Sequence, residues 1–489
     1  MRSHRSLVLV VPLLGAPLLV AAGRAETPLP AVEGPIAGPG TAFVQATSFD
    51  LADVGYVQEE YFIAGTARAW TPAGPLGDDG RWAVTAGETA PFRTRLVVHR
   101  PIDRKAFTGT VVVEWLNVSG GLDAAPDWTM AHTAFVRQGW AWVGVSAQVV
   151  GVEGGSALVG VVSLPLKAVN PERYGRLQHP GDSFSYDIFS QAGQAIRAAT
   201  GPRPLGDLPV RRLLAAGESQ SAFRLVTYVN AIHPVARVYD GYFIHSRGGL
   251  ALAGLSEPPQ PAIPVPGAAP VRDDIDVPVL IFQTETDLTF LASVAARQPD
   301  AGNVRLWEVA GTAHADAYTL VVGPGDRGDS PAVAGLVVTA APIPGLIECA
   351  RPINAGPQHF VGKAAFVALE RWVRRRKPPR AAPRLEVTPG PLPAIVVDEH
   401  GNARGGIRTP AVDVPIATFT GEQDGSILCR LFGSTTPFDG AKLRSLYPTR
   451  GVFVRKYRRA LARAVRAGWI LRPDAKLMRA WAAGAGIGG

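Results

Sequence analysis

Short apolar runs alternate with amphipathic stretches along most of the chain. The apolar runs are rich in Val, Ile and Leu, as in 109–115, which indicates strands buried on both faces of a sheet. The amphipathic stretches repeat their apolar positions at the spacing of a helix face, as in 360–376. Because strands and helices alternate, the pattern predicts an α/β fold, with a mostly parallel sheet covered by helices on both faces.

The predicted elements divide the chain into a core and a C-terminal extension. We expect strands at 57–64, 94–98, 109–115, 140–146, 213–216, 237–244, 277–283 and 304–309, of which the first two are antiparallel. We expect helices at 128–137, 186–199, 222–232 and 360–376, and two basic ones at 451–467 and 475–483. The stretch Lys377-Pro378-Pro379 marks the boundary, so the predicted core is 26–376, and the extension that packs on it is 377–489.

The first 25 residues, 1–25, have the composition of a secretory signal peptide. Arg2 and Arg5 precede an apolar segment at 7–22, and Gly23-Arg24-Ala25 provides the small residues of a cleavage site. At about 16 residues, with two prolines, the apolar segment is short for a bilayer span. The sequence therefore predicts an exported protein, secreted or periplasmic, with no stable membrane span after cleavage. An uncleaved membrane anchor is the alternative.

Composition and charge narrow the choice of partners. Hydrophobic residues make up 47% of the chain and charged residues 18%, which allows a large core and excludes global disorder. The net charge of +8 comes largely from arginines in clusters such as 374–377 and 455–459. Apart from Tyr457, these clusters lack the interleaved aromatic residues of a single-strand binder, so we expect solvated helix ends and no nucleic-acid partner.

The cysteines and histidines give no metal-binding pattern. Neither a CxxC pair nor an HExxH motif is present, so we expect no metal and no cofactor. The two cysteines, Cys349 and Cys429, either form a disulfide in an oxidising compartment or stay apart as buried thiols. The sequence leaves both alternatives open, because it does not give their separation in space.

A serine motif follows one of the predicted buried strands. Gly217-Glu218-Ser219-Gln220-Ser221 joins the run 213–216 to the predicted helix 222–232. A serine on a sharp turn from a strand to a helix is exposed as a nucleophile, and small flanking residues let the turn close. The motif usually ends in Gly, where Ser221 stands here. A second copy at 181–185 follows no strand, so we interpret it as the start of the next helix.

An acid and a histidine follow in the order that this arrangement requires. The strand at 277–283 enters a polar turn that ends in Asp287, and the strand at 304–309 precedes a glycine turn and His314. The order Ser, acid, His differs from that of chymotrypsin-like and subtilisin-like enzymes.

Together with these motifs, two further phrases make the chain similar to α/β-hydrolase serine esterases, and more closely to secreted bacterial proteins with an α/β-hydrolase domain. The phrases are 110–119 and 401–410, and the resemblance spans about 57–482. It implies the α/β-hydrolase fold, in which a cap often follows the sixth strand. Here 248–277 is too rich in proline for a helical lid, so we expect 147–182 and the extension to wall the active site.

The resemblance assigns roles to three side chains. Ser219 is expected as the nucleophile, His314 as the general base and Asp287 as the residue that orients the imidazole. Glu285 lies on the same turn as Asp287 and is the alternative acid. In the fold that the chain resembles, the acid usually lies about nine residues after the proline that precedes this strand. Counted from Pro278, that position is Asp287, which favours it over Glu285.

Further residues are expected around this triad. One oxyanion donor is the backbone N–H of Gln220, and the second is that of Asn117 or Val118, on the loop after the strand 109–115. His245 and Arg247 follow the sixth predicted strand at its carboxyl end, where ligands bind in α/β sheets. Arg247 either pairs with a substrate carboxylate or bonds loop carbonyls.

The sequence thus predicts an exported serine hydrolase that cleaves small-molecule carboxylic esters, with lactones as a further class, through an acyl-enzyme. One alternative is a non-catalytic binding protein on the same scaffold, because a fold does not fix a function. Another is an amidase or peptidase with the same triad. The oligomeric state is left open.

Overall fold

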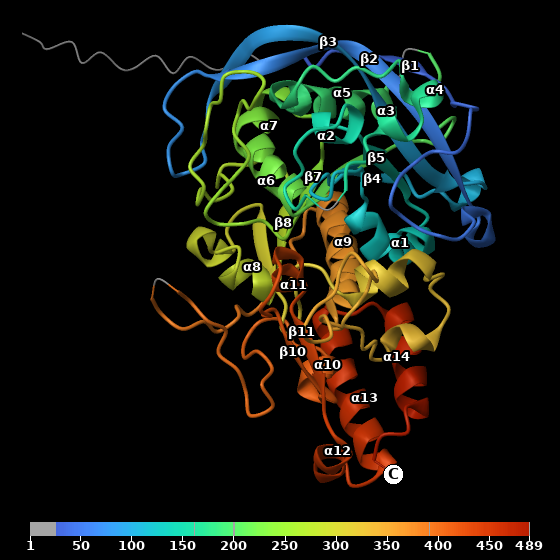
Figure 1. Ribbon diagram of the computed structural model, residues 1–489, viewed down its shortest axis with the longest axis vertical. Coiled ribbons are helices and arrows are strands. Elements are labelled where there is room, and N and C mark those ends of the chain that lie inside the picture. Colours follow the sequence, from blue (N-terminus) through green and yellow to red (C-terminus); the bar gives the residue numbers. More distant parts are fainter. Residues whose placement is uncertain (1–25, 161, 199–200, 391, 489) are drawn as a thin grey trace, which may run out of the picture.

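The computed structural model describes residues 26–160, 162–198, 201–390 and 392–488 (Figure 1). The predicted signal peptide lies outside the described residues. Within them, nine strands form one sheet in the order β1-β2-β3-β5-β4-β6-β7-β8-β9. The strands β5, β4, β6, β7, β8 and β9 pair in parallel, each with the next in this order. The pairs β1–β2, β2–β3 and β3–β5 along the other edge are antiparallel. The predicted α/β class with a mostly parallel sheet is confirmed.

The strands of the sheet are β1 (Ala31–Glu33), β2 (Tyr56–Pro72), β3 (Val84–Pro101), β4 (Thr110–Trp115), β5 (Ala141–Val145), β6 (Arg212–Glu218), β7 (Gly241–His245), β8 (Val279–Gln283) and β9 (Val304–Glu308). A separate two-stranded antiparallel sheet consists of β10 (Ala417–Thr420) and β11 (Ser434–Pro437). The longer helices are α1 (Pro126–Gln138), α5 (Ser185–Arg197), α6 (Gln220–Thr227), α9 (Gln358–Arg375), α13 (Arg450–Ala467) and α14 (Arg472–Gly484). The short helices are α2 (Val149–Val152), α3 (Leu166–Val169), α4 (Pro171–Tyr174), α7 (His233–Ala236), α8 (Glu285–Thr289), α10 (Pro410–Asp413), α11 (Ile427–Phe432) and α12 (Gly440–Leu446).

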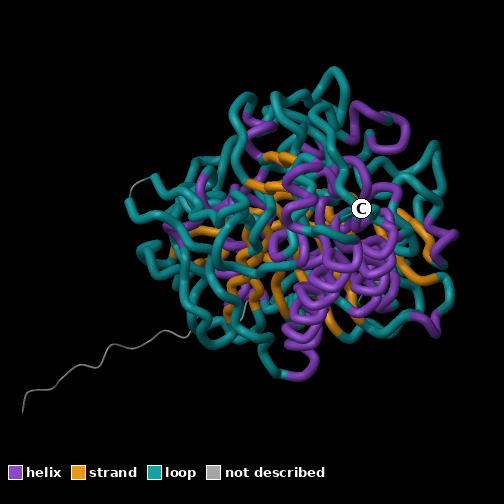
Figure 2. Tube along the Cα trace, turned by 90° about the horizontal axis from the view of Figure 1, so that it is seen from below, coloured by secondary structure: helices purple, strands orange, loops and turns teal. Residues whose placement is uncertain are grey.

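Two hydrophobic cores lie on opposite faces of the sheet. Along β4, Val111 and Val113 belong to the core that includes α5 and α6, while Val112 belongs to the core that includes α1 and α9. Successive side chains of a strand point to opposite faces, so a run of valines fills both cores. Figure 2 shows the strands enclosed by helices and loops.

One predicted strand is shorter than its apolar pattern suggested. The run 237–244 forms a strand only from Gly241, because Arg237 adopts a left-handed conformation (φ 48°) and ends α7. The helix predicted at 222–232 is present, as α6 and the π-helical turn that continues it to Ile232.

The C-terminal extension is bonded to the edge of the sheet. Ile407 donates its N–H to the carbonyl of Glu308 at 2.7 Å and accepts from the N–H of Ala310 at 3.1 Å, so it continues the pairing beyond β9. Helices α13 and α14, red in Figure 1, pack on each other and bury Phe453 and Met478. The division of the chain at residue 376 stays a prediction.

The helices of the described residues are each too short or too polar to cross a membrane. In the same part of the chain, no cluster of three or more His, Cys, Asp or Glu side chains has the arrangement of a metal site.

Candidate active site

Ser219 lies on a strained turn between β6 and α6. Its backbone has φ 59° and ψ −121°, a conformation that residues other than Gly rarely adopt. The turn is tight, because a Cβ on Gly217 would lie 3.1 Å from the Cβ of Ser221. Ser221 replaces the usual glycine without a clash. It is buried, and its hydroxyl donates to the carbonyl of Leu116 at 3.3 Å.

Three predicted side chains meet at this turn. His314 Nε2 lies 2.7 Å from Ser219 Oγ, and His314 Nδ1 lies 2.7 Å from Asp287 Oδ1. The second oxygen of Asp287 accepts the N–H of Thr284 at 2.7 Å, which fixes the carboxylate at the start of α8. Residues 95 and 27 positions apart in the sequence are joined in this way by one chain of hydrogen bonds.

Glu285, the alternative acid, lies on the same turn but does not contact the histidine. Its two oxygens accept the N–H groups of Gly311 and Gly421, so the carboxyl group joins the core to the extension. Burial raises its pKa to about 8. The alternative of Glu285 as the orienting acid was therefore wrong, because the first turn of α8 points the two carboxyl groups in different directions.

A second carboxyl group, which the sequence analysis missed, contacts the catalytic histidine candidate. Glu218 Oε1 lies 3.2 Å from His314 Nε2, on the side of the ring that faces Ser219. Burial raises the pKa of Glu218 to about 7. Burial alone would lower the pKa of His314, but the carboxylates of Glu218 and Asp287 outweigh it and raise that pKa. The position of Glu218 at the end of a buried strand, directly before the serine, was the available signal.

Of the two predicted donors on the loop after β4, only the N–H of Val118 is left free by the described residues to bind a substrate oxygen. The N–H of Asn117 donates to the carbonyl of Ala124 at 2.9 Å and is not available to a substrate, which corrects one of the two predicted alternatives. The N–H of Val118 has no acceptor among the described residues. The side-chain amide of Asn117 donates to Glu218 Oε2 at 3.0 Å and ties the loop to the nucleophile turn. Gln220 begins α6, where the first N–H groups have no partner within the helix.

His245 and Arg247 lie behind the site instead of lining it. The Arg247 guanidinium is buried and donates to the carbonyls of Gly248 and Ala269 at 2.8 Å each. The prediction of a substrate contact for Arg247 is therefore replaced by the second reading, in which it bonds loop carbonyls. His245 Nδ1 lies 2.8 Å from Asp127 Oδ1, and burial lowers the pKa of His245 to about 4. It therefore has a supporting position and does not reach the cavity, contrary to its predicted substrate contact.

A cavity of about 380 Å³ lies against Ser219 and His314. Its walls come from the loop after β4, from Val159, Val162 and Leu164, from the chain after His314, and from α11 of the extension. The predicted walls at 147–182 and in the extension are among them. The wall at 343–347 was missed, because this segment has no helical or strand period.

The family follows from the sequence. The family model of the alpha/beta hydrolase domain matches residues 25–480. The chain belongs to this family. Solved structures similar to it include a serine hydrolase without lid from Xanthomonas campestris, at 14% identity and a TM-score of 0.27 over 50% of this chain and 83% of that one. Est1E from Butyrivibrio proteoclasticus, with bound ferulic acid, is 11% identical, at a TM-score of 0.27 over 45% and 86% of the two chains. No curated protein matches the chain.

Membership of the alpha/beta hydrolase domain family agrees with the observed sheet. A parallel sheet that carries Ser219 after β6, Asp287 after β8 and His314 after β9 places all three at the carboxyl ends of strands. Ligands of open α/β sheets bind at this edge. The resemblance noted in the sequence is confirmed, and the protein has the α/β-hydrolase fold.

Proposed function

We propose that this protein is a serine hydrolase that cleaves carboxylic esters, including lactones, which are cyclic esters. The observation that carries the proposal is the hydrogen-bond chain from Ser219 through His314 to Asp287, at the wall of a cavity that can hold a small molecule.

The first step is attack on the ester carbonyl. His314 Nε2 takes the proton of Ser219 Oγ as the oxygen forms a bond to the carbonyl carbon. The Nδ1–H group of His314 donates a hydrogen bond to Asp287 Oδ1, which holds the ring in the required tautomer and stabilises the imidazolium. Glu218 adds a second negative group beside the same ring.

The negative charge that develops on the carbonyl oxygen needs fixed donors. The N–H groups of Gln220 and Val118 are assigned this role, because the described hydrogen bonds leave the Val118 N–H free and Gln220 begins a helix. A preorganised donor of this kind contributes about 3 kcal/mol to the transition state.

The second half of the reaction releases the products. The tetrahedral intermediate collapses, the bond from the carbonyl carbon to the alcohol oxygen breaks, and His314 returns its proton to the leaving alcohol. A water molecule then gives a proton to His314 and attacks the acyl-enzyme. The acid leaves, and the proton returns to Ser219 Oγ.

The strained turn favours catalysis over a purely binding role. A non-glycine residue at φ 59° costs free energy, and a binding scaffold has no need of that strain at the serine. An amidase or peptidase would use the same three side chains, so the proposal is tested against both alternatives. The disulfide between Cys349 and Cys429 supports export, because disulfides persist in oxidising compartments.

The test measures the hydrolysis of p-nitrophenyl acetate and of the matching p-nitroanilide by wild type and two variants. Wild type is expected to hydrolyse the ester much faster than the anilide. Ser219→Ala is expected to remove nearly all turnover while changing stability by no more than about 1 kcal/mol. Ser183→Ala is the matched control: Ser183 belongs to the second copy of the motif, bonds Ser256 at 2.7 Å, and does not contact His314. Folded wild-type protein without turnover on any ester would contradict the proposal.

A further inference from the structure

One wall of the cavity beside Ser219 is made of two separate segments. Ile343, Leu346 and Ile347 come from the chain after His314, and Leu428, Leu431 and Phe432 come from α11 of the C-terminal extension. We call these six residues the clamped wall. All six side chains are hydrocarbon, so this wall offers a bound molecule no hydrogen bond from a side chain.

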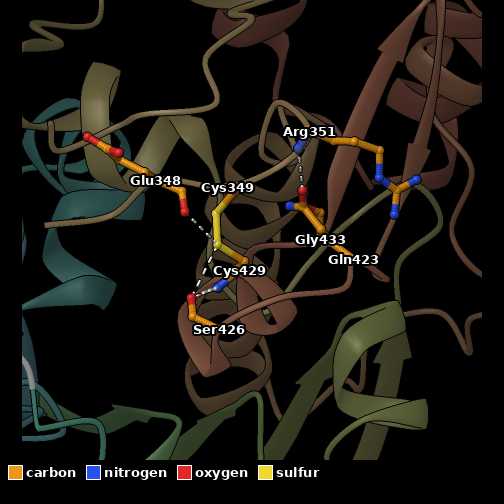
Figure 3. Close-up of a disulfide and its surroundings, with 7 residues drawn as sticks. All are labelled: Glu348, Cys349, Arg351, Gln423, Ser426, Cys429 and Gly433. Carbon is orange, nitrogen blue, oxygen red and sulfur yellow. Dashed lines mark hydrogen bonds between the residues drawn. A yellow bond between two sulfur atoms is a disulfide. The ribbon is translucent and has the colours of Figure 1, made fainter. Parts of the chain in front are cut away.

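The disulfide joins the two segments of the clamped wall. Cys349 lies two positions after Ile347, and Cys429 lies directly after Leu428 in α11. The two Cα atoms are 5.6 Å apart, although the cysteines are 80 positions apart in the sequence (Figure 3). The disulfide is thus placed where it holds the two halves of the wall against each other.

Hydrogen bonds reinforce the same junction. Arg351 donates its N–H to Gln423 Oε1 at 2.8 Å, and Gln423 donates its amide to the carbonyl of Gly433 at 2.6 Å, as Figure 3 shows. The N–H of Ala315, next to His314, donates to the carbonyl of Leu431 at 3.4 Å. These bonds do not depend on the disulfide. When the disulfide is cleaved, we expect the two segments of the wall to become more mobile while their backbone keeps the same course.

The clamped wall also reaches the surface. Leu346 is 44% exposed although it lines the cavity, whereas Ile347 is 6% exposed. Exposed apolar surface at a cavity is typical of a groove that binds apolar groups. Ser219 and His314, which line the same cavity, are the polar groups that act on the ester bond itself.

We infer that the clamped wall binds the hydrocarbon chain of the ester, and that the Cys349–Cys429 disulfide sets the chain length that this site accepts. This inference rests on the proposed function. The substrate class is an ester with an aliphatic chain of several carbons. The chain belongs to either the acid or the alcohol of that ester, and the experiment includes an arm for each.

Burial of each methylene on this wall is expected to raise kcat/KM by about fourfold until the cavity is full. The acyl arm uses p-nitrophenyl esters from acetate to dodecanoate. The alcohol arm uses alkyl acetates from methyl to octyl. The arm in which kcat/KM rises with chain length identifies the part of the ester that the clamped wall holds.

The disulfide is tested with Cys349→Ala/Cys429→Ala and with wild type treated with a phosphine reductant. Both are expected to keep kcat/KM for the shortest ester within about twofold, because Ser219, Asp287 and His314 lie on other elements. In both, kcat/KM is expected to fall at least tenfold for the ester with the longest chain that wild type hydrolyses efficiently. The reductant is expected to have no effect on the double variant, which is the control for its other actions.

A second variant tests the clamped wall with the disulfide intact. Leu431→Trp narrows the cavity and is expected to move the preferred chain to a shorter length. Leu250→Trp is the matched control, since Leu250 is 76% exposed and does not line the cavity. Unchanged chain-length preference in Leu431→Trp and in the disulfide variant, with ester hydrolysis intact, would overturn the inference and leave the proposed function standing. Absence of hydrolysis for every ester would overturn both.

Discussion

Replacement of Glu218 by Gln is expected to stabilise the protein at alkaline pH. The carboxyl group is buried, with Oε1 3.2 Å from His314 Nε2 and Oε2 3.0 Å from the amide of Asn117. Burial raises the pKa of Glu218 from its ordinary value of 4.5 to about 7. The folded protein therefore binds this proton more tightly than the unfolded chain, and ionisation of Glu218 opposes folding.

The sign and the pH window follow from these two values. The contribution of Glu218 to stability is fully present below about pH 4.5, is lost as the pH rises to about 7, and stays lost above it. The difference between the two pKa values corresponds to about 3 kcal/mol. Gln does not ionise. The free energy of unfolding of Glu218→Gln should therefore exceed that of wild type by about 3 kcal/mol at pH 8 and equal it at pH 4.

The same substitution is expected to alter catalysis. Loss of the carboxylate lowers the pKa of His314, which Glu218 and Asp287 raise against the effect of burial. The acid limb of the kcat/KM profile should move to lower pH, because His314 must be neutral to accept the serine proton. Urea unfolding at pH 4, 6 and 8 and a pH profile of ester hydrolysis measure the two effects. Glu399→Gln, on a side chain that is 81% exposed, is the control. A stability difference that does not grow with pH, or an acid limb that stays in place, would refute the reasoning.

Three further substitutions separate catalytic from structural positions. Asp287→Asn should lower kcat by about 10⁴-fold, because the histidine loses the partner that fixes its tautomer; an effect below tenfold would count against its role. Glu285→Ala should leave kcat within about threefold but lower the free energy of unfolding by about 2–4 kcal/mol, since it leaves two buried N–H groups without an acceptor; urea titration checks this. Arg247→Met should destabilise by a similar amount while KM stays unchanged, and a large rise in KM would restore it as a substrate contact.

The parts of the fold that depend on burial could be predicted from the sequence. A strand such as β4 has valine at three successive positions, 111–113, because both of its faces are covered, and this pattern is local. The motif around Ser219 could also be placed, because the turn needs small neighbours on both sides. The order of Asp287 and His314 after two later strands then located the other candidates.

The parts of the site that depend on contacts between distant segments could not be predicted. The N–H of Asn117 pairs with Ala124 in a loop whose register no local pattern encodes. The orientation of Glu218 depends on where His314 arrives, 96 positions later in the chain. The wall at 343–347 has neither a helical nor a strand period, and the disulfide depends on a separation in space. For Arg247, the sequence offered two partners, and only the positions of the loop carbonyls decide between them.

The most direct test of the account is covalent labelling with a fluorophosphonate, followed by mapping of the modified peptide by mass spectrometry. Wild type is expected to form a single adduct on Ser219 rapidly, and His314→Gln much more slowly, because Gln has no imidazole to take the proton of the hydroxyl. Labelling of Ser183 or Ser221 instead, or no labelling of a protein shown to be folded, would contradict the claim that Ser219 is an activated nucleophile.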